Sequence, residues 1–237
     1  MRAIILAAGL SSRLYPLTLK KPKCLLELVP GKTIIEHQIK VLKKCGIKDV
    51  IVVTGYGNDK IKDLLKNSVR YRNFINFSKY NNLHTLYSIK DELNDDILCL
   101  MSDVIFGESL LRKCLDDKED FCLLVHNKSI LKDTMRVKIV NGGIVDIGNH
   151  ISRKNADGNF IGIAKFSKNG ARLLVKEMKK LIKDSKHDND YYTISLVGVA
   201  KKNKIGYKFV GDEPWIEVDF LKDYVKAKNK IYPLVKL

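Results

Sequence analysis

The chain has 237 residues, of which 45% are hydrophobic and 30% charged, and its formal net charge is +16. This length suffices for one α/β domain with a substantial core, and no apolar run approaches the roughly 20 residues that a membrane helix requires. The apolar run from Ile4 to Ala8 is too short for a secretory signal peptide. We therefore expect a single domain over residues 1–237 and no membrane partner.

The cysteines and lysines narrow the class of protein further. The cysteines form no C-x-x-C pair and lie at Cys24, Cys45, Cys99, Cys114 and Cys122. An odd, scattered set indicates reduced thiols in a cytoplasmic protein and argues against a disulfide framework or a zinc site. The lysines are spread over nearly every amphipathic segment without interleaved aromatic residues, so we expect solvated helix faces and no nucleic-acid partner.

The N-terminal strand ends in a loop of small residues. The run Ile4 to Ala8 stops at Gly9, Arg13 follows the loop, and Lys23 comes ten residues later on a Pro-marked segment. Backbone N–H groups in such a loop are open to an anion, because little beyond Cα blocks close approach. Two cations placed just past it would neutralise a polyphosphate. The alternative, with equal weight on residue types alone, is a buried strand, a turn and two ordinary surface cations.

Predicted strands and helices alternate through the first half of the chain. In the first predicted helix, 33–45, Thr33 and Glu36 form a capping box and Gly46 follows the last turn. The elements after it are strand 49–54, helix 58–66, strand 74–77, helix 82–93, strand 96–101, helix 108–115 and strand 120–126. This alternation predicts parallel strands with ligands at their carboxyl ends, where Gly9 and Asp103 both fall.

The second half of the chain begins with a hairpin signal. Asn141-Gly142 lies between the apolar segments 136–140 and 144–147 and is a hairpin signal, because it supplies positive φ at the turn. The remaining predicted elements are strand 160–166, helix 169–183, strands 205–210 and 215–218, and helix 221–230. We predict a three-layer, Rossmann-like α/β fold whose sheet is mixed but mainly parallel, with helices on both faces and a small β-hairpin insertion in the second half.

Two aspartates occupy positions where an unpaired carboxylate is costly. Asp103 lies between an apolar strand and Val104-Ile105-Phe106, and Asp219 follows the short apolar strand 215–218. Such a residue is paired, hydrogen-bonded or bound to a metal. Carboxylate oxygens at two strand ends beside a phosphate loop suit Mg²⁺, which would bridge the phosphates. For Asp219 alone, an N-cap of the helix beginning near Leu221 has equal weight.

The order of these features resembles the signature of the sugar-phosphate and alcohol-phosphate nucleotidyltransferases, L-A-A-G-x-G-[ST]-R-L-x-P-L-T-x-x-x-P-K. The chain differs at Ser11, where the family usually has a second glycine. A further match is the terminal W-x-E-[VI]-D-x-x-x-D-[LY] segment, with Phe220 in place of the usual threonine. The resemblance spans Met1 to about Pro233. It implies that a nucleotide lies over Leu6, Ala7, Ala8, Gly9, Ser11, Ser12, Arg13 and Lys23.

The resemblance also implies a reaction. Arg13 and Lys23 would be catalytic and hold the β/γ and α phosphates, while Asp103 and Asp219 would bind Mg²⁺. An acceptor's phosphate or phosphonate oxygen would attack the α-phosphorus in line and pyrophosphate would leave, without a general base, because the acceptor is already a dianion. The nucleotide-binding half would be 1–126 and the acceptor-binding half 127–237. A homodimer is left open.

The segment from Tyr80 to Ser88 resembles the N-x-x-[ST]-L segment of cytidylyltransferases that act on phosphocholine, aminoethylphosphonate or inositol phosphate. This favours CTP, with Asn82 and Thr85 near the base; on composition alone an Asn N-cap is favoured. The Gln-x-x-x-x-G-[TL]-A-x-[AS] segment typical of enzymes using UTP or dTTP does not occur. Alternatives are a sugar-1-phosphate nucleotidyltransferase using UTP, dTTP or GTP, and, more remotely, a non-catalytic nucleotide- or polyanion-binding protein.

The acceptor is less clearly encoded. Asp190 and Tyr191 belong to a segment that could meet a cationic head group through carboxylates and ring faces, or could equally be an acidic N-cap with half-buried tyrosines. Arg136, Lys138 and Lys165 are candidates for the acceptor phosphate. Phosphocholine, aminoethylphosphonate and a phosphorylated amino acid amide such as phosphoglutamine all fit this pattern.

Overall fold

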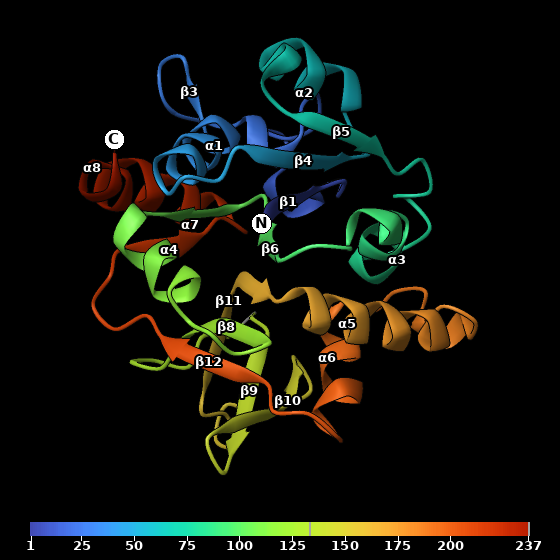
Figure 1. Cartoon of the computed structure of the whole chain (residues 1–237). Helices are drawn as coiled ribbons and strands as arrows, with labels where there is room; N and C mark the ends of the chain where they lie inside the picture. Colours follow the sequence, from blue (N-terminus) through green and yellow to red (C-terminus); the bar gives the residue numbers. More distant parts are fainter. Residues whose placement is uncertain (133, 237) are drawn as a thin grey trace.

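The computed structural model describes residues 1–132 and 134–236, as a central sheet with helices on both faces (Figure 1). Four parallel strands from the first half of the chain lie in the order β6, β1, β4, β5. Their bounds are Arg2–Ala7 (β1), Asp49–Thr54 (β4), Arg70–Asn73 (β5) and Ile97–Met101 (β6). Because these strands are parallel, their carboxyl ends meet at one rim of the sheet.

Strand β11, Gly158–Phe166, joins the second half of the chain to this sheet. It pairs antiparallel with β6 and with β8, Phe121–His126, beyond which β12, Gly206–Phe209, continues the sheet. The hairpin of β9, Arg136–Val140, and β10, Gly143–Gly148, pairs with the start of β11. Within the described ranges the sheet has nine strands. The predicted α/β fold with its mixed sheet and inserted hairpin is confirmed.

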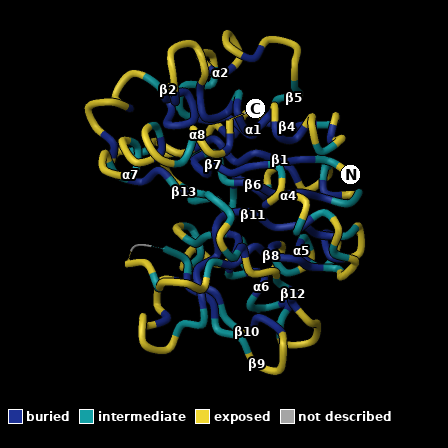
Figure 2. The backbone as a smooth tube through the Cα atoms, turned by 90° about the vertical axis from the view of Figure 1, so that its left-hand side faces the viewer, coloured by how far each residue is buried: buried dark blue, intermediate teal, exposed yellow. Residues whose placement is uncertain are grey.

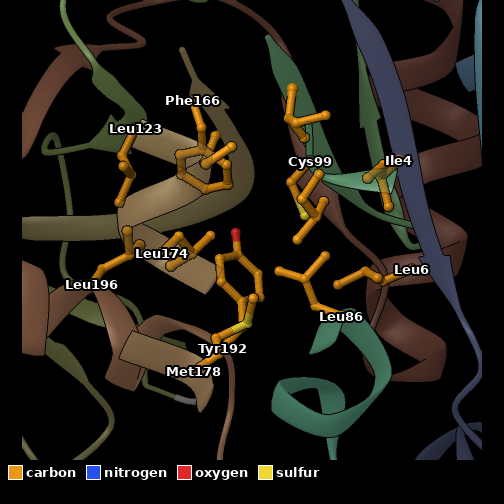
Figure 3. Packing of buried hydrophobic residues seen from close by; sticks show 14 of the residues in the cluster. Ile4, Leu6, Leu86, Cys99, Leu123, Phe166, Leu174, Met178, Tyr192 and Leu196 are labelled. Atoms are coloured by element: carbon orange, nitrogen blue, oxygen red, sulfur yellow. The ribbon is translucent and has the colours of Figure 1, made fainter. Parts of the chain in front are cut away.

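Helices cover both faces of the sheet and bury its strands (Figure 2). One face carries α1 (Ile34–Lys44), α2 (Asn58–Leu65) and α4 (Glu108–Leu115). The other carries α3 (Asn82–Tyr87), α5 (Lys168–Leu181) and α6 (Thr193–Ala200). On the second face Tyr192 lies among Leu86, Leu174 and other core side chains, as Figure 3 shows. The two hydrophobic layers make the sheet a rigid support for the loops at its rim.

A smaller layer covers one side of this rim. Strand β7, Val104–Phe106, pairs antiparallel with β13, Trp215–Glu217, and the pair β2, Glu27–Val29, with β3, Lys32–Thr33, lies near it. The chain ends in α7 (Leu221–Lys226), a π-helical turn (Ala227–Ile231) and α8 (Tyr232–Val235), which pack on these strands. Short 3₁₀ helices span Ser12–Leu14, Lys23–Leu25, Lys66–Ser68, Lys90–Glu92 and Ser185–His187. No helix in 1–132 or 134–236 has the length and apolar character needed to cross a membrane.

Most predicted elements are found within a residue or two, and the capping box of Thr33 and Glu36 is present. The strand predicted at 74–77 is wrong, because the edge strand β5 lies just before it and Ile75 is 74% exposed in a turn. The helix predicted at 82–93 ends at Tyr87 and continues only as the 3₁₀ turn Lys90–Glu92. Strands β2, β3 and β7 and helices α6 and α8 were not predicted from the sequence.

Candidate active site

The loop after β1 is open at Gly9 and contains one residue in a left-handed conformation, Ser11. Gly9 leaves open space where a Cβ would stand, and Ser11 adopts a left-handed conformation with φ of 56°. This is the backbone region that glycine adopts most readily, so the serine keeps the loop geometry at some steric cost. The Oγ1 atom of Thr18 donates to the Ser11 carbonyl over 2.8 Å and holds the turn.

The strand pair β7 and β13 brings two distant carboxylates together. Asp103 lies between β6 and β7, and Asp219 follows β13 by two residues. The Val218 N–H donates to the Asp103 carbonyl over 3.0 Å and fixes the two segments side by side. Carboxylate oxygens of Asp103, Glu217 and Asp219 all lie within 4.8 Å of one another.

Lys23 and Arg13 face these carboxylates. The Lys23 ammonium lies 2.7 Å from Asp103 Oδ2 and 3.0 Å from Asp219 Oδ1, and an Arg13 guanidinium nitrogen lies 2.9 Å from Asp219 Oδ1. Burial alone would lower the pKa of Lys23, but the carboxylates of Asp103 and Asp219 outweigh it and raise that pKa above its ordinary value. Lys23 therefore remains a cation and cannot serve as a general base.

Glu217 is the third member of the carboxylate cluster. Burial raises its pKa to about 8, and the negative charges of Asp103 and Asp219 act in the same direction. Lys23 and Arg13 oppose this rise only in part. The cluster thus holds more potential negative charge than its two cations balance.

The residues fit a divalent cation. Asp103 is 9% exposed, and among the described residues its Oδ1 has no hydrogen-bond partner. A buried carboxylate oxygen without a partner is costly and calls for a ligand. Three converging carboxylates of the Asp/Glu type are the oxygen donors that Mg²⁺ prefers.

Two cavities meet at this cluster. The first, of about 580 Å³, runs along the phosphate loop and includes every residue predicted to bind nucleotide: Leu6, Ala7, Ala8, Gly9, Ser11, Ser12, Arg13, Lys23, Asn82 and Thr85. The second, of about 400 Å³, lies beside it toward β9 and α6. Arg13, Asn82, Glu217 and Asp219 line both. No histidine of the described chain lines either cavity.

Asn82 and Thr85 lie at the start of α3, as the sequence indicates. Asn81 caps the helix, and the side-chain oxygen of Asn82 accepts from the Tyr192 N–H over 2.7 Å. Among the described residues, the hydrogen-bond partner of the Asn82 amide nitrogen is the sulfur of Met101, at 3.8 Å. Asn82 therefore joins the nucleotide corner to the start of α6 and retains a donor for a ligand.

Of the five predicted acceptor residues, two line a cavity and three do not. Tyr191 lines both cavities and Arg136 lines the second, where its guanidinium donates to backbone carbonyls that include those of Ile151 and Lys132. The other three predicted residues, Lys138, Lys165 and Asp190, line neither cavity.

Each of these three has a partner of its own. Lys138 pairs with Asp157, and Asp190 pairs with His187. Lys165 donates to the Asp117 carbonyl and lies opposite Leu98, near the amino end of β6 and away from the rim. The assignment of Lys165 to the acceptor was wrong, because β11 runs antiparallel to β6.

Sequence reasoning missed Glu217 and Lys132. Glu217 precedes Asp219 by two residues on an extended segment, a spacing that places both side chains on one face. That signal was present in the W-x-E-x-D segment. Lys132 lies in a loop without a recognisable pattern and lines the second cavity.

A phosphate loop, two cations and a carboxylate cluster at one rim of an α/β sheet define a nucleotide-handling transferase. Residues 3–136 match the family model described as the MobA-like NTP transferase domain. This match covers more than half of the chain, so the chain belongs to that family, and it is a nucleotidyltransferase.

Two relatives and one solved structure show what the chain is similar to within this family. The chain is 31% identical to a CTP:phosphoglutamine cytidylyltransferase of Campylobacter jejuni, over 94% of this chain and 97% of the relative. It is 41% identical to a choline-phosphate cytidylyltransferase of Streptococcus pneumoniae over 45% of this chain and 46% of the relative. The solved CTP:phosphocholine cytidylyltransferase of S. pneumoniae superposes with a TM-score of 0.79 at 26% identity, covering 96% and 97% of the two chains.

Proposed function

We propose that the chain is a Mg²⁺-dependent cytidylyltransferase that transfers CMP from CTP to a small phosphorylated or phosphonate head group. The observation that carries this proposal is that two cavities meet at Glu217 and Asp219, with Asp103 in the same carboxylate cluster and Lys23 and Arg13 against it. The names of the relatives support CTP and a phosphorylated acceptor. The described cysteines are free, which supports a cytoplasmic setting.

The chemistry is a displacement at the α-phosphorus of CTP. The triphosphate occupies the first cavity and the acceptor the second. An acceptor oxygen bonds to the α-phosphorus, the bond from that phosphorus to the bridging oxygen of the β-phosphate breaks, and its electron pair leaves with pyrophosphate. Mg²⁺ held by Asp103, Asp219 and Glu217 would supply charge neutralisation.

The residues of the chain position the two substrates and neutralise their negative charge. Lys23 and Arg13 offer positive charge where negative charge accumulates, and the burial of Lys23 strengthens its interaction because little water screens it. The acceptor phosphate is already ionised, and the described lining of the cavities holds no histidine that would take a proton from it. The amide nitrogen of Asn82 suits an acceptor atom of the base, such as O2 or N3 of cytosine.

A matrix of four triphosphates against phosphorylated head groups, with pyrophosphate release as the measurement, tests the proposal. The acceptor set includes phosphocholine, aminoethylphosphonate, inositol phosphate, phosphoglutamine and a sugar 1-phosphate. We expect release with CTP and a head-group phosphate, and a loss of release when EDTA is added. A preference for UTP, dTTP or GTP with the sugar phosphate would replace the proposal by a sugar nucleotidyltransferase, and no release from any pair would refute enzymatic activity of this kind.

A further inference from the structure

The second cavity has lining residues that the first lacks. Besides Arg13, Glu217 and Asp219, its lining includes Lys132 and Asn149 and the first residue of α6, Thr193. We refer to Lys132, Asn149 and Thr193 as the acceptor wall. This wall would face whatever part of the acceptor lies beyond its phosphate.

The start of α6 favours a negative charge. The helix dipole is positive there, although the Ile194 and Ser195 N–H groups already donate to the carbonyls of Tyr191 and Tyr192. Thr193 is 2% exposed, and within the described parts of the chain its hydroxyl has no hydrogen-bond partner. A buried hydroxyl left unpaired costs free energy, so its position in the cavity lining points to a ligand group that completes its hydrogen bonding.

Lys132 adds a positive charge to the same wall. Its backbone carbonyl accepts from the buried Arg136, which ties the loop to β9, while its ammonium has no ion-pair partner in the described residues. Lys132 is exposed, and a lysine in a cavity lining supplies charge for an incoming anion.

The same wall is poorly suited to a quaternary ammonium group. Such groups bind in cages of aromatic faces or beside carboxylates. Among the described lining residues the carboxylates are Glu217 and Asp219, which belong to the metal-binding end. Of the aromatic side chains, Phe160 is 5% and Tyr192 1% exposed, so only Tyr191 offers an open ring.

We infer that the acceptor carries a carboxylate in addition to its phosphate, so that it is a phosphorylated amino acid or amino acid amide and not phosphocholine. The carboxylate would bind between Lys132 and the start of α6 at Thr193, while the phosphate oxygen faces the carboxylate cluster. This inference rests on the proposed cytidylyltransferase activity and specifies its second substrate.

O-phosphoserine and phosphoethanolamine test the inference, because they differ only in the carboxylate. With CTP and Mg²⁺ we expect kcat/KM for O-phosphoserine to exceed that for phosphoethanolamine by roughly 10-fold or more, the usual effect of a hydrogen bond to a charged group. Phosphoglutamine and phosphocholine extend the comparison to a larger head group of each kind.

Variants of Lys132 and Thr193 test whether these residues cause the preference for an acceptor with a carboxylate. Lys132→Met and Thr193→Val should each reduce the ratio of the two kcat/KM values several-fold, with the KM for CTP unchanged. Thr193→Ser keeps the hydroxyl and should restore the ratio, and Lys204→Met, a surface residue paired with Glu119, is the matched control. Asp133 lies outside the described residues, so Asp133→Asn is added to detect a carboxylate that serves an ammonium group.

The possible results distinguish the inference about the acceptor from the proposed cytidylyltransferase activity. Turnover of phosphocholine or phosphoethanolamine at an equal or higher kcat/KM would overturn the inference while leaving the cytidylyltransferase proposal intact. A ratio unaffected by Lys132→Met and Thr193→Val, or a fall in phosphocholine turnover confined to Asp133→Asn, would also overturn it. No pyrophosphate release from any pair would overturn both.

Discussion

Replacing Glu217 by glutamine should make the stability of the protein less dependent on pH. Burial and the charges of Asp103 and Asp219 raise the pKa of Glu217 from an ordinary value of 4.5 to about 8. Between these values the folded chain keeps a proton that the unfolded chain has lost. The free energy of unfolding of the wild type therefore falls as the pH rises through this window.

The size of the effect follows from this window. Each pH unit well inside it costs about 1.4 kcal/mol of unfolding free energy and less near either pKa, so the loss between pH 5 and pH 8 amounts to roughly 3.5 kcal/mol. Glutamine resembles the protonated acid in shape and never ionises. We expect Glu217→Gln to match the wild type near pH 5 and to exceed it in stability by roughly that amount at pH 8.

Urea unfolding at pH 5 and pH 8 with EDTA measures this difference. Glu119→Gln, a surface substitution outside the cluster, is the control. Its difference in unfolding free energy from the wild type should be the same at pH 5 and at pH 8. Added Mg²⁺ at pH 8 should stabilise the wild type more than Glu217→Gln, because a ligand of the folded state favours it and the variant has lost one carboxylate. A stability difference that is equal at both pH values would refute the assigned environment of Glu217.

Three further predictions concern the same site. Asp103→Asn should lower the rate of pyrophosphate release by at least roughly 100-fold and raise the Mg²⁺ concentration for half-maximal rate, with far-UV circular dichroism unchanged. Asp223 accepts from the Phe220 N–H at 2.8 Å and the Asp219 N–H at 3.3 Å, so Asp223→Ala should cost about 1 kcal/mol in urea unfolding and weaken the Mg²⁺ dependence, while Asp223→Asn restores both. At Ser11, with its φ of 56°, Ser11→Val should cost at least about 1 kcal/mol in the same unfolding assay and Ser11→Gly no more than about 0.5 kcal/mol.

Structural features that depend on residues adjacent in the sequence were predictable. The capping box at Thr33 and Glu36, the Asn141-Gly142 turn and the loop after β1 each depend on local backbone geometry, and the structure has all three. Strand order predicted that Gly9 and Asp103 lie at one rim. The juxtaposition of Asp103 with Asp219 was expected from the family resemblance, because the antiparallel pair of β7 and β13 that brings them together was not predicted.

Features that depend on strand direction or on distant partners were not predictable. Lys165 was misplaced because nothing in the local pattern shows that β11 runs antiparallel to β6. The edge strand β5 is polar, Arg70-Tyr71-Arg72-Asn73, since only one of its edges pairs and it buries little surface. The start of α6 carries β-branched Thr193 and Ile194, whose local preference is overridden by packing against α5 and β10.

The same packing explains why the acceptor side of the site is hard to find in the sequence. The nucleotide side is built from one continuous loop, whereas the acceptor wall combines a loop beside β9 with the start of α6. The two sides are coupled by hydrogen bonds that include the one from the Tyr192 N–H to the side-chain oxygen of Asn82 and the one from the Leu83 N–H to the Asp190 carbonyl. A change in the acceptor wall can therefore alter nucleotide binding through Asn82, and for this reason the KM for CTP distinguishes a direct effect on the acceptor from a displaced α6.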